Sequence, residues 1–181
     1  MAGSGPGNDR VTIRRATPED ATRLAAFGRQ AFTDTFGAVN TPEDLALYLE
    51  ATYGPDLQRA EIANPRVSCW LAEAEGRVAG YALLRRGPAP SLVADDSAVE
   101  LGRLYAGREF IGHGVGSLLM RAALDEAKDA GIRMMWLGVW EHNARALGFY
   151  QRWKFEIVGR QPFLLGRDLQ QDYVTVRPVA D

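Results

Sequence analysis

Residues 110–120 read FIGHGVGSLLM, in which Gly112, Gly114 and Gly116 alternate just before an apolar helical pattern begins. Glycine inside a helix costs roughly 0.5–1 kcal/mol relative to alanine, so three in succession need a reason. The first N–H groups of a helix lack partners and, with the helix dipole, favour an anion. Glycine lets a phosphate group approach that backbone closely. The stretch therefore predicts a pyrophosphate-binding loop with Ser117 as an extra donor, the alternative being a flexible helix entry.

The segments around this loop predict a mixed α/β fold. Period-two and β-branched patterns indicate strands over residues 11–16, 68–76, 77–87, 98–107, 133–142, 154–160 and 173–179. Capped, proline-started or apolar-periodic patterns indicate helices from 18 to 36, from 42 through at least 49, from 55 to 63, from 115 to 130 and from 144 to 153. A loop is expected over 162–172. The order β-α-α-(α)-β-β-β-α-β-α-β-β predicts a central sheet of about seven strands, flanked by helices, with a parallel crossover over 98–142.

Composition limits the possible functions. The chain has 181 residues, 46% of them apolar, and a net charge of −2, so no nucleic-acid partner is expected. One cysteine, Cys69, indicates a reducing, cytoplasmic setting, and two histidines with it are too few for a zinc site. The polar start, residues 1–10, predicts a disordered tail rather than a signal peptide. The sequence contains no apolar run long enough to predict a membrane helix. Residues 11–181 are expected to form a single domain.

A second motif follows the strand WLGVW (136–140) and reads N-x-x-A-x-x-F-Y-x-x-x-x-F over residues 143–155. Together with the strand end LYA (104–106) and the glycine loop, it resembles the GNAT family of N-acetyltransferases. The resemblance covers residues 11–179 and implies the GNAT-type, mostly antiparallel sheet and acetyl-CoA as co-substrate. Lys154 departs from the glycine that the family commonly has at that position.

The resemblance implies a set of coenzyme A contacts. The loop residues around the pyrophosphate would be Ile111, Gly112, His113, Gly114, Val115, Gly116 and Ser117. Ile111 stands where the family usually has Gln or Arg, but contacts through main-chain N–H groups do not depend on that side chain. The backbone of Leu104, Tyr105 and Ala106 would pair with the pantetheine arm, and the N–H of Ala106 would polarise the thioester carbonyl. Asn143 matches the family asparagine that contacts CoA, and it is equally suited to cap a helix.

Two residues are candidates for proton transfer. Tyr150 matches the family tyrosine beside the CoA sulfur, where a phenol can protonate the leaving thiolate; by spacing alone it also fits a packed aromatic stripe. An amine with a pKa near 10.4 is about one part in a thousand neutral at pH 7, so a base is needed. Glu100 is the expected base, unless it only pairs with Arg103 at the surface. Glu141 and His142 are weaker candidates, and His113 is expected to be solvated.

The first helices are expected to form the acceptor wall. Residues 17–64 carry a net charge of −5 and the rest of the chain +3, which suits a cationic amine on one side and a polyanionic cofactor on the other. Acidic surface helices are also common without such a role. Segments such as FTDTFGAVNTPEDLALYLE (32–50) resemble the PaiA-type spermidine/spermine acetyltransferases of bacteria. That resemblance implies polyamine contacts from Asp34, Thr35, Glu43 and Tyr48.

Other functions remain open from sequence alone. They are a protein or peptide N-acetyltransferase, a non-catalytic acyl-CoA-binding module, and a nicotinamide enzyme with a Rossmann-type loop. Against the last, several residues separate the strand from Gly112. The expected partner is a small-molecule amine, and the expected assembly is a monomer or a homodimer.

Overall fold

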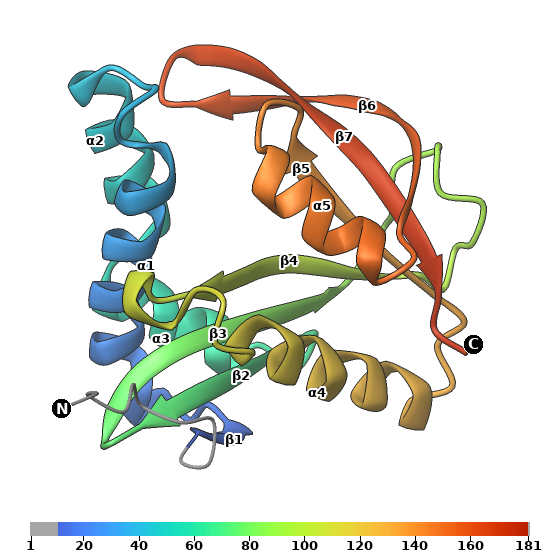
Figure 1. The fold of residues 1–181 in the computed structure, drawn as a ribbon, viewed down its shortest axis with the longest axis horizontal. Helices are drawn as coiled ribbons and strands as arrows, with labels where there is room; N and C mark the ends of the chain where they lie inside the picture. The colour runs from blue at the N-terminus through green and yellow to red at the C-terminus, as the bar shows by residue number, and fades with distance from the viewer. Residues whose placement is uncertain (1–10, 181) are drawn as a thin grey trace, which may run out of the picture.

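The computed structural model describes residues 11–180 and shows one seven-stranded sheet in the order β1-β2-β3-β4-β5-β7-β6 (Figure 1). Neighbouring strands are antiparallel except for β4 and β5, which are parallel. The strands are β1 (Val11–Arg15), β2 (Val67–Ala74), β3 (Arg77–Arg86), β4 (Val99–Ala106), β5 (Met134–Trp140), β6 (Glu156–Leu165) and β7 (Asp168–Pro178). The helices are α1 (Ala21–Phe36), α2 (Pro42–Thr52), α3 (Pro55–Ala63), α4 (Val115–Asp129) and α5 (Ala144–Arg152).

The fold class predicted from the sequence is confirmed, and the helix starts follow the predicted signals. The Thr41 hydroxyl accepts a hydrogen bond from the Asp44 N–H (3.2 Å), which caps α2, and prolines occupy the first turns of α2 and α3. Glu75 and Gly76 have φ of 52° and 74°, the conformation of a tight hairpin turn between β2 and β3. Residues 1–10, the expected tail, lie outside the described residues.

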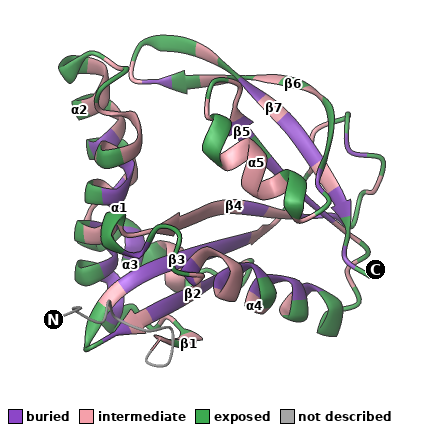
Figure 2. Ribbon diagram, in the orientation of Figure 1, coloured by how far each residue is buried: buried purple, intermediate pink, exposed green. Residues whose placement is uncertain are grey.

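Alternating side chains separate two cores on the two faces of the sheet. Figure 2 colours the buried residues purple, and they include most of β3. Ala72 and Leu84 belong to the core that packs under α4, and partly buried residues of α5 pack against it. Leu71 and Leu83 belong to the core that includes Leu24 of α1 and touches α3. The sheet therefore has α4 and α5 on one face and α1 and α3 on the other.

The parallel strands β4 and β5 separate after two residue pairs. Val99 pairs with Met135 and Glu100 with Trp136, and beyond Glu100 the structure records no further pairing between the two strands. Next to this point β4 carries a bulge, because Leu84 pairs with Leu101 and Leu83 with Arg103, which leaves Gly102 between them unpaired. The rest of β4 therefore has a free edge toward a gap in the middle of the sheet.

The loop expected over 162–172 is wrong. β6 and β7 instead form a long hairpin in which Pro162 pairs with Gln171 and the turn lies at Gly166 (φ 62°). Pro162 and the polar residues after it hid this strand in the sequence. Because β6 is an edge strand of the sheet, proline is tolerated there.

Candidate active site

A cavity of about 420 Å³ lies between the glycine loop, the free edge of β4 and helix α5. Ile111, Gly112, Gly114, Gly116 and Ser117 line it from the loop. We call it the donor cavity.

Most main-chain N–H groups of the glycine loop are unpaired. The N–H of His113 donates to the Phe110 carbonyl (3.1 Å) and that of Ile111 to the Arg108 carbonyl (3.5 Å), and the first bond of α4 runs from Leu118 to Gly114 (3.0 Å). Within the described part of the chain, five N–H groups of the loop have no acceptor: those of Gly112, Gly114, Val115, Gly116 and Ser117. Four of these five residues, all except Val115, line the donor cavity, and unpaired N–H groups at a helix start favour an anion.

The three glycines of the loop are needed for two different reasons, a left-handed backbone and close packing of two helices. Gly112 and Gly114 both have φ of 84°, a left-handed conformation that other residues adopt only with strain. Gly116 has an ordinary helical position, but a Cβ there would lie 3.4 Å from the ring of Phe149 in α5. The loop can therefore turn sharply, and α5 can approach the start of α4.

Two of the predicted loop contacts do not line the donor cavity. The His113 side chain is exposed, and the Val115 side chain is fully buried in the core, where a Cβ on Gly80 would lie 2.8 Å from it. Only their main-chain N–H groups belong to the loop geometry. Asn143 lines the cavity and also caps α5, because its Oδ1 accepts from the Ala146 N–H (3.1 Å). Both readings of Asn143 are thus compatible.

The free edge of β4 directs N–H groups into the gap. The N–H of Gly107 donates to the Ala79 carbonyl (2.8 Å), and Tyr105 pairs with Tyr81, so these residues bond toward β3. Because bonding direction alternates along a strand, Leu104 and Ala106 turn their N–H groups the other way, toward the gap. Both residues line the donor cavity.

Tyr150 is held in place by the end of α5. The Lys154 N–H donates to the Gln151 carbonyl (2.9 Å) and the Phe155 N–H to the Tyr150 carbonyl (3.0 Å), a Schellman motif in which Lys154 has φ of 61°. The rings of Tyr150 and Phe155 are 5.6 Å apart. Burial raises the pKa of the Tyr150 hydroxyl well above its usual value, so it is protonated at neutral pH.

Sequence reasoning missed two cations of the donor cavity. Arg145 and Arg152, both on α5, line it, whereas no Asp or Glu does. An exposed arginine on a short helix carries no signal by itself. Its place beside the glycine loop becomes visible only once α5 packs against the start of α4.

A second cavity of about 200 Å³ lies toward α1 and α2, and we call it the acceptor cavity. Phe32, Phe36 and Tyr48 from the first two helices, with Trp140 and Phe163, give it aromatic walls. Five residues line both cavities: Leu104, Tyr105, Asn143, Ala146 and Tyr150. The two cavities therefore meet at the gap between β4 and β5.

Of the four predicted acceptor residues, the structure brings only Tyr48 into the acceptor cavity. Thr35 lines the donor cavity, and its hydroxyl donates to the Ala31 carbonyl (2.8 Å). Asp34 is exposed and accepts from Gln30 (2.8 Å), and Glu43 is exposed in the first turn of α2. Neither carboxylate lines a cavity at this site.

The expected acidic wall of the first helices is also absent from this cavity, because none of the acidic residues of 17–64 lines it. Some of these acids bond to groups elsewhere in the chain. Asp20 pairs with Arg14 (2.7 Å) and Asp44 accepts from the Arg167 N–H (2.8 Å). The first helices contribute aromatic rings to the acceptor cavity, and its charged groups come from the sheet.

Three charged residues line the acceptor cavity: Glu100, Arg103 and Asp172. Glu100 accepts a hydrogen bond from Arg85 (2.8 Å), so the suggested pairing with Arg103 is wrong. Arg103 instead donates to Glu61 of α3 (2.6 Å).

Asp172 is the charged group of this cavity that sequence reasoning missed. It lies on β7, between Trp140 of β5 and Gln161 of β6 in the sheet register. Its side chain has no hydrogen-bond or ion-pair partner among the described residues. Burial raises the pKa of its carboxyl to about 6. Because residue 172 was assigned to a loop, the sequence offered no signal for it.

Two kinds of feature are absent from the described residues. These residues contain no group of three or more His, Cys, Asp or Glu side chains arranged to hold a metal ion. None of their helices combines the length and apolar character that crossing a membrane requires.

Comparisons with known proteins agree with this geometry. The sequence model of the acetyltransferase (GNAT) family matches residues 30–155. An uncharacterised N-acetyltransferase of Lactobacillus delbrueckii is 34% identical over 164 residues, which is 91% of this chain and 95% of that protein. A second, from Mycobacterium tuberculosis, is 35% identical over 158 residues, 87% of this chain and 97% of that protein.

Solved structures share the fold. The PaiA N-acetyltransferase of Thermoplasma acidophilum, determined with coenzyme A, superposes with a TM-score of 0.75 at 20% identity, covering 93% of this chain and 98% of that one. A ribosomal-protein-alanine N-acetyltransferase of Brucella melitensis gives 0.71 at 23% identity, covering 92% and 99%. With the family match over most of its length, this chain belongs to the acetyltransferase (GNAT) family and is an acetyl-CoA-dependent N-acetyltransferase.

Proposed function

We propose that this enzyme transfers the acetyl group of acetyl-CoA to a primary amine of a small cationic acceptor such as a polyamine, by direct attack on the thioester. The observation that carries the proposal is the meeting of the donor and acceptor cavities at Tyr150, in the gap between β4 and β5. Two substrates bound in these cavities bring their reacting groups together without an acetylated enzyme residue.

The donor side fits the phosphates of coenzyme A. Four loop residues with unpaired N–H groups, Gly112, Gly114, Gly116 and Ser117, line a cavity that Arg145 and Arg152 also line. A diphosphate carries the charge that these groups stabilise, and the glycines leave room for it. The free edge of β4 is available to the amide groups of the pantetheine arm.

Two groups act on the thioester in this proposal. The Ala106 N–H points into the gap and stabilises negative charge on the carbonyl oxygen as it develops. The Tyr150 hydroxyl, kept protonated by burial, donates its proton to the departing sulfur.

The acceptor side suits an ammonium group. Aromatic faces attract cations, and Asp172 adds one negative charge that has no internal partner. The cavity volume of about 200 Å³ accommodates a slender aminoalkyl chain more readily than a folded peptide terminus. Glu100, the base expected from the sequence, lines this cavity, but Arg85 holds its carboxylate. Asp172 is a second candidate for the general base.

Release of the coenzyme A thiol from acetyl-CoA in the presence of an acceptor tests the function directly. Purified enzyme is mixed with acetyl-CoA and, separately, spermidine, spermine, amino acids, aminoglycosides and peptides with free N-termini or lysines, and products are identified by mass spectrometry. We expect release with polyamines and a mass gain of one acetyl group on the amine. Release with peptides alone would identify a protein acetyltransferase. Acetyl-CoA binding without acceptor-dependent release would identify a binding module.

The proposal also includes a cytoplasmic location and a monomer or homodimer as the assembly. Cys69 is a free, buried thiol whose pKa burial raises to about 12, so it is unreactive and fits a reducing compartment. Light scattering of the purified protein determines the assembly.

A further inference from the structure

We propose that Asp172 is the general base of the reaction: its carboxylate receives the ammonium group of the acceptor and takes the proton that blocks attack. This inference rests on the proposed amine acetylation. It assigns to β7 a role that the sequence suggested for Glu100 on β4.

Asp172 is buried and free for a ligand. Its relative exposure is 8%, and none of the described residues makes a hydrogen bond or ion pair with its side chain. Every fully buried side-chain N or O atom of the described residues has a hydrogen-bond partner. The Asp172 oxygens must therefore be reachable by a small molecule, and the acceptor cavity is the space that they line. A buried carboxylate without an internal partner is costly unless a ligand uses it.

The sheet provides room for this carboxylate at Gly138. A Cβ on Gly138 would lie 3.1 Å from Asp172 Oδ2 and 2.9 Å from Gln161 Nε2. Any larger residue at 138 would push on both groups. The glycine of β5 therefore leaves a small polar pocket, with an amide and a carboxylate, in an otherwise aromatic wall.

The other charged groups of the cavity are already balanced. Glu100 is paired with Arg85, and Arg103 with Glu61. An arriving ammonium group finds its unneutralised counter-charge at Asp172.

Titratable groups around Asp172 do not compete for the proton. Tyr48, Tyr105 and Tyr150 also line the acceptor cavity. Burial raises the pKa of each, in Tyr48 to about 12 with a further contribution from the Tyr53 and Asp172 charges, so all three stay neutral. Burial is the one cause of the raised Asp172 pKa, about 6, which leaves this carboxyl ionised at pH 7 but more basic than an exposed one.

The protons balance in the following way. The ammonium group gives one proton to Asp172, and the neutral nitrogen then forms a bond to the carbonyl carbon. When the carbon–sulfur bond breaks, the Tyr150 hydroxyl gives its proton to sulfur and regains one from the nitrogen. Asp172 releases its proton to solvent. One proton is released per acetylated ammonium group.

The test compares Asp172→Asn with Glu100→Gln, using spermidine and acetyl-CoA between pH 5 and pH 10. In the wild-type enzyme kcat/KM should rise through an apparent pKa near 6 as Asp172 ionises. Asp172→Asn should lower kcat/KM at pH 7 by about 100-fold. It should also remove the rise of kcat/KM around pH 6, which we call the acidic limb of the pH profile. The loss should shrink toward pH 10, because the free amine then needs less help. Asp172→Glu should recover part of the rate. Glu100→Gln should keep the acidic limb.

Calorimetry with acetyl-CoA separates catalysis from folding, because Asp172→Asn should bind the donor as the wild type does. An intact acidic limb and a near-normal rate in Asp172→Asn would overturn the inference, as would loss of the limb in Glu100→Gln, which would assign the base to Glu100. If the wild-type enzyme itself acetylates no amine, the proposed function falls and this inference falls with it. That failure is visible before any variant is made.

Discussion

Gly112 and Gly131 share a left-handed backbone but have different surroundings. Their φ values are 84° and 69°, and at each a Cβ would meet no atom within 4 Å. Gly112→Ala and Gly131→Ala should each cost about 1 kcal/mol of unfolding free energy, because alanine is strained at positive φ. Only Gly112→Ala places its methyl group in the donor cavity, so it alone should raise the KM for acetyl-CoA, by about tenfold. Urea denaturation and initial-rate kinetics measure the two effects. A raised KM in Gly131→Ala would count against a local cause.

Tyr150→Phe separates the hydroxyl from the ring. The ring contacts with Phe149 and Phe155 remain, and the proton donor is lost. We expect kcat to fall about 100-fold with little change in melting temperature or in the KM for acetyl-CoA. Tyr173→Phe on β7 is the control, because its hydroxyl accepts from Arg160 and lines neither cavity. An unchanged kcat in Tyr150→Phe would remove the acid assignment.

The sequence pointed to candidate residues in two short local motifs, the glycine loop and the segment 143–150, and residues of both line the donor cavity. The glycine loop, Asn143 and Tyr150 could be proposed because each motif is a recognisable run of residue types at fixed spacing. Asp172 is not readable, because its role depends on the register of two distant strands and on the space left at Gly138. Asp34 and Glu43 failed for the opposite reason: their helix positions were right, but the aromatic faces of α1 and α2 turn inward and these carboxylates do not.

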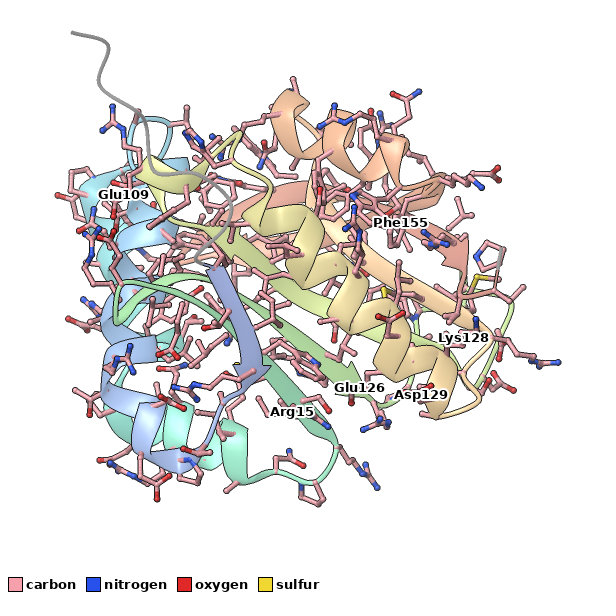
Figure 3. All side chains as sticks on the ribbon, turned by 60° about the horizontal axis from the view of Figure 1, so that its bottom comes forward. Arg15, Glu109, Glu126, Lys128, Asp129 and Phe155 are labelled. Carbon is pink, nitrogen blue, oxygen red and sulfur yellow. The ribbon has the colours of Figure 1, made fainter. Side chains whose placement is uncertain are left out.

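Helix α4 is tied to the sheet through Glu126, which has a side-chain exposure of 10%. Its carboxylate accepts from Ser68 (2.5 Å) and from the indole of Trp70 (2.6 Å), and it pairs with Arg15 (3.2 Å; Figure 3) and Arg86 (3.3 Å). The tie connects the helix that begins at the glycine loop to β1, β2 and β3. It fixes α4 near its C-terminal end.

Glu126→Gln should lower the unfolding free energy by about 2–4 kcal/mol, because it leaves two arginines near an uncharged amide. The matched control is Glu109→Gln. Glu109, labelled on the other side of the view in Figure 3, pairs with Arg77 (3.0 Å), but both side chains are about 60% exposed. That substitution should cost less than about 1 kcal/mol. Thermal and urea unfolding measure both, and equal losses in the two variants would refute the distinction.

Strands were predictable where their faces alternate, as in β2 and β3, and where they are buried, as in β5. The length of the β6–β7 hairpin was predicted too short, because one end of it carries Pro162, Gly166 and polar residues over 167–172. Pro162 costs little because β6 is an edge strand, and residues 168–171 of β7 lie beyond Trp140, the last β5 residue in register with β7. Local sequence preference is weakest where the sheet meets solvent.

Two buried aspartates give the unfolding free energy of the domain opposite responses to acid. The hydrogen bonds from Arg14 lower the pKa of Asp20 to about 2, so its contribution is present above pH 4 and is lost as the pH falls toward 2. Burial raises the pKa of Asp172 to about 6, so its charge destabilises the fold above pH 6, and this penalty disappears between pH 6 and pH 4.

Asp172→Asn should therefore raise the unfolding free energy at pH 7.5 by about 1–3 kcal/mol. The gain should vanish near pH 4, where the wild-type carboxyl is also uncharged. Urea denaturation at the two pH values gives the comparison, with Asp168→Asn as an exposed control on the same strand. A destabilised Asp172→Asn at pH 7.5 would mean that its carboxylate has a partner in solution.

At the gap between β4 and β5, the donor cavity, lined by the glycine loop and α5, meets the acceptor cavity, lined in part by α1 and α2. A single ligand that joins the sulfur of coenzyme A to a primary amine through a short spacer would occupy the donor cavity and the acceptor cavity at the same time. Such a bisubstrate ligand should exceed the affinity of either half by about 10²–10⁴-fold. Its spacer length would then measure the distance between the two cavities in solution.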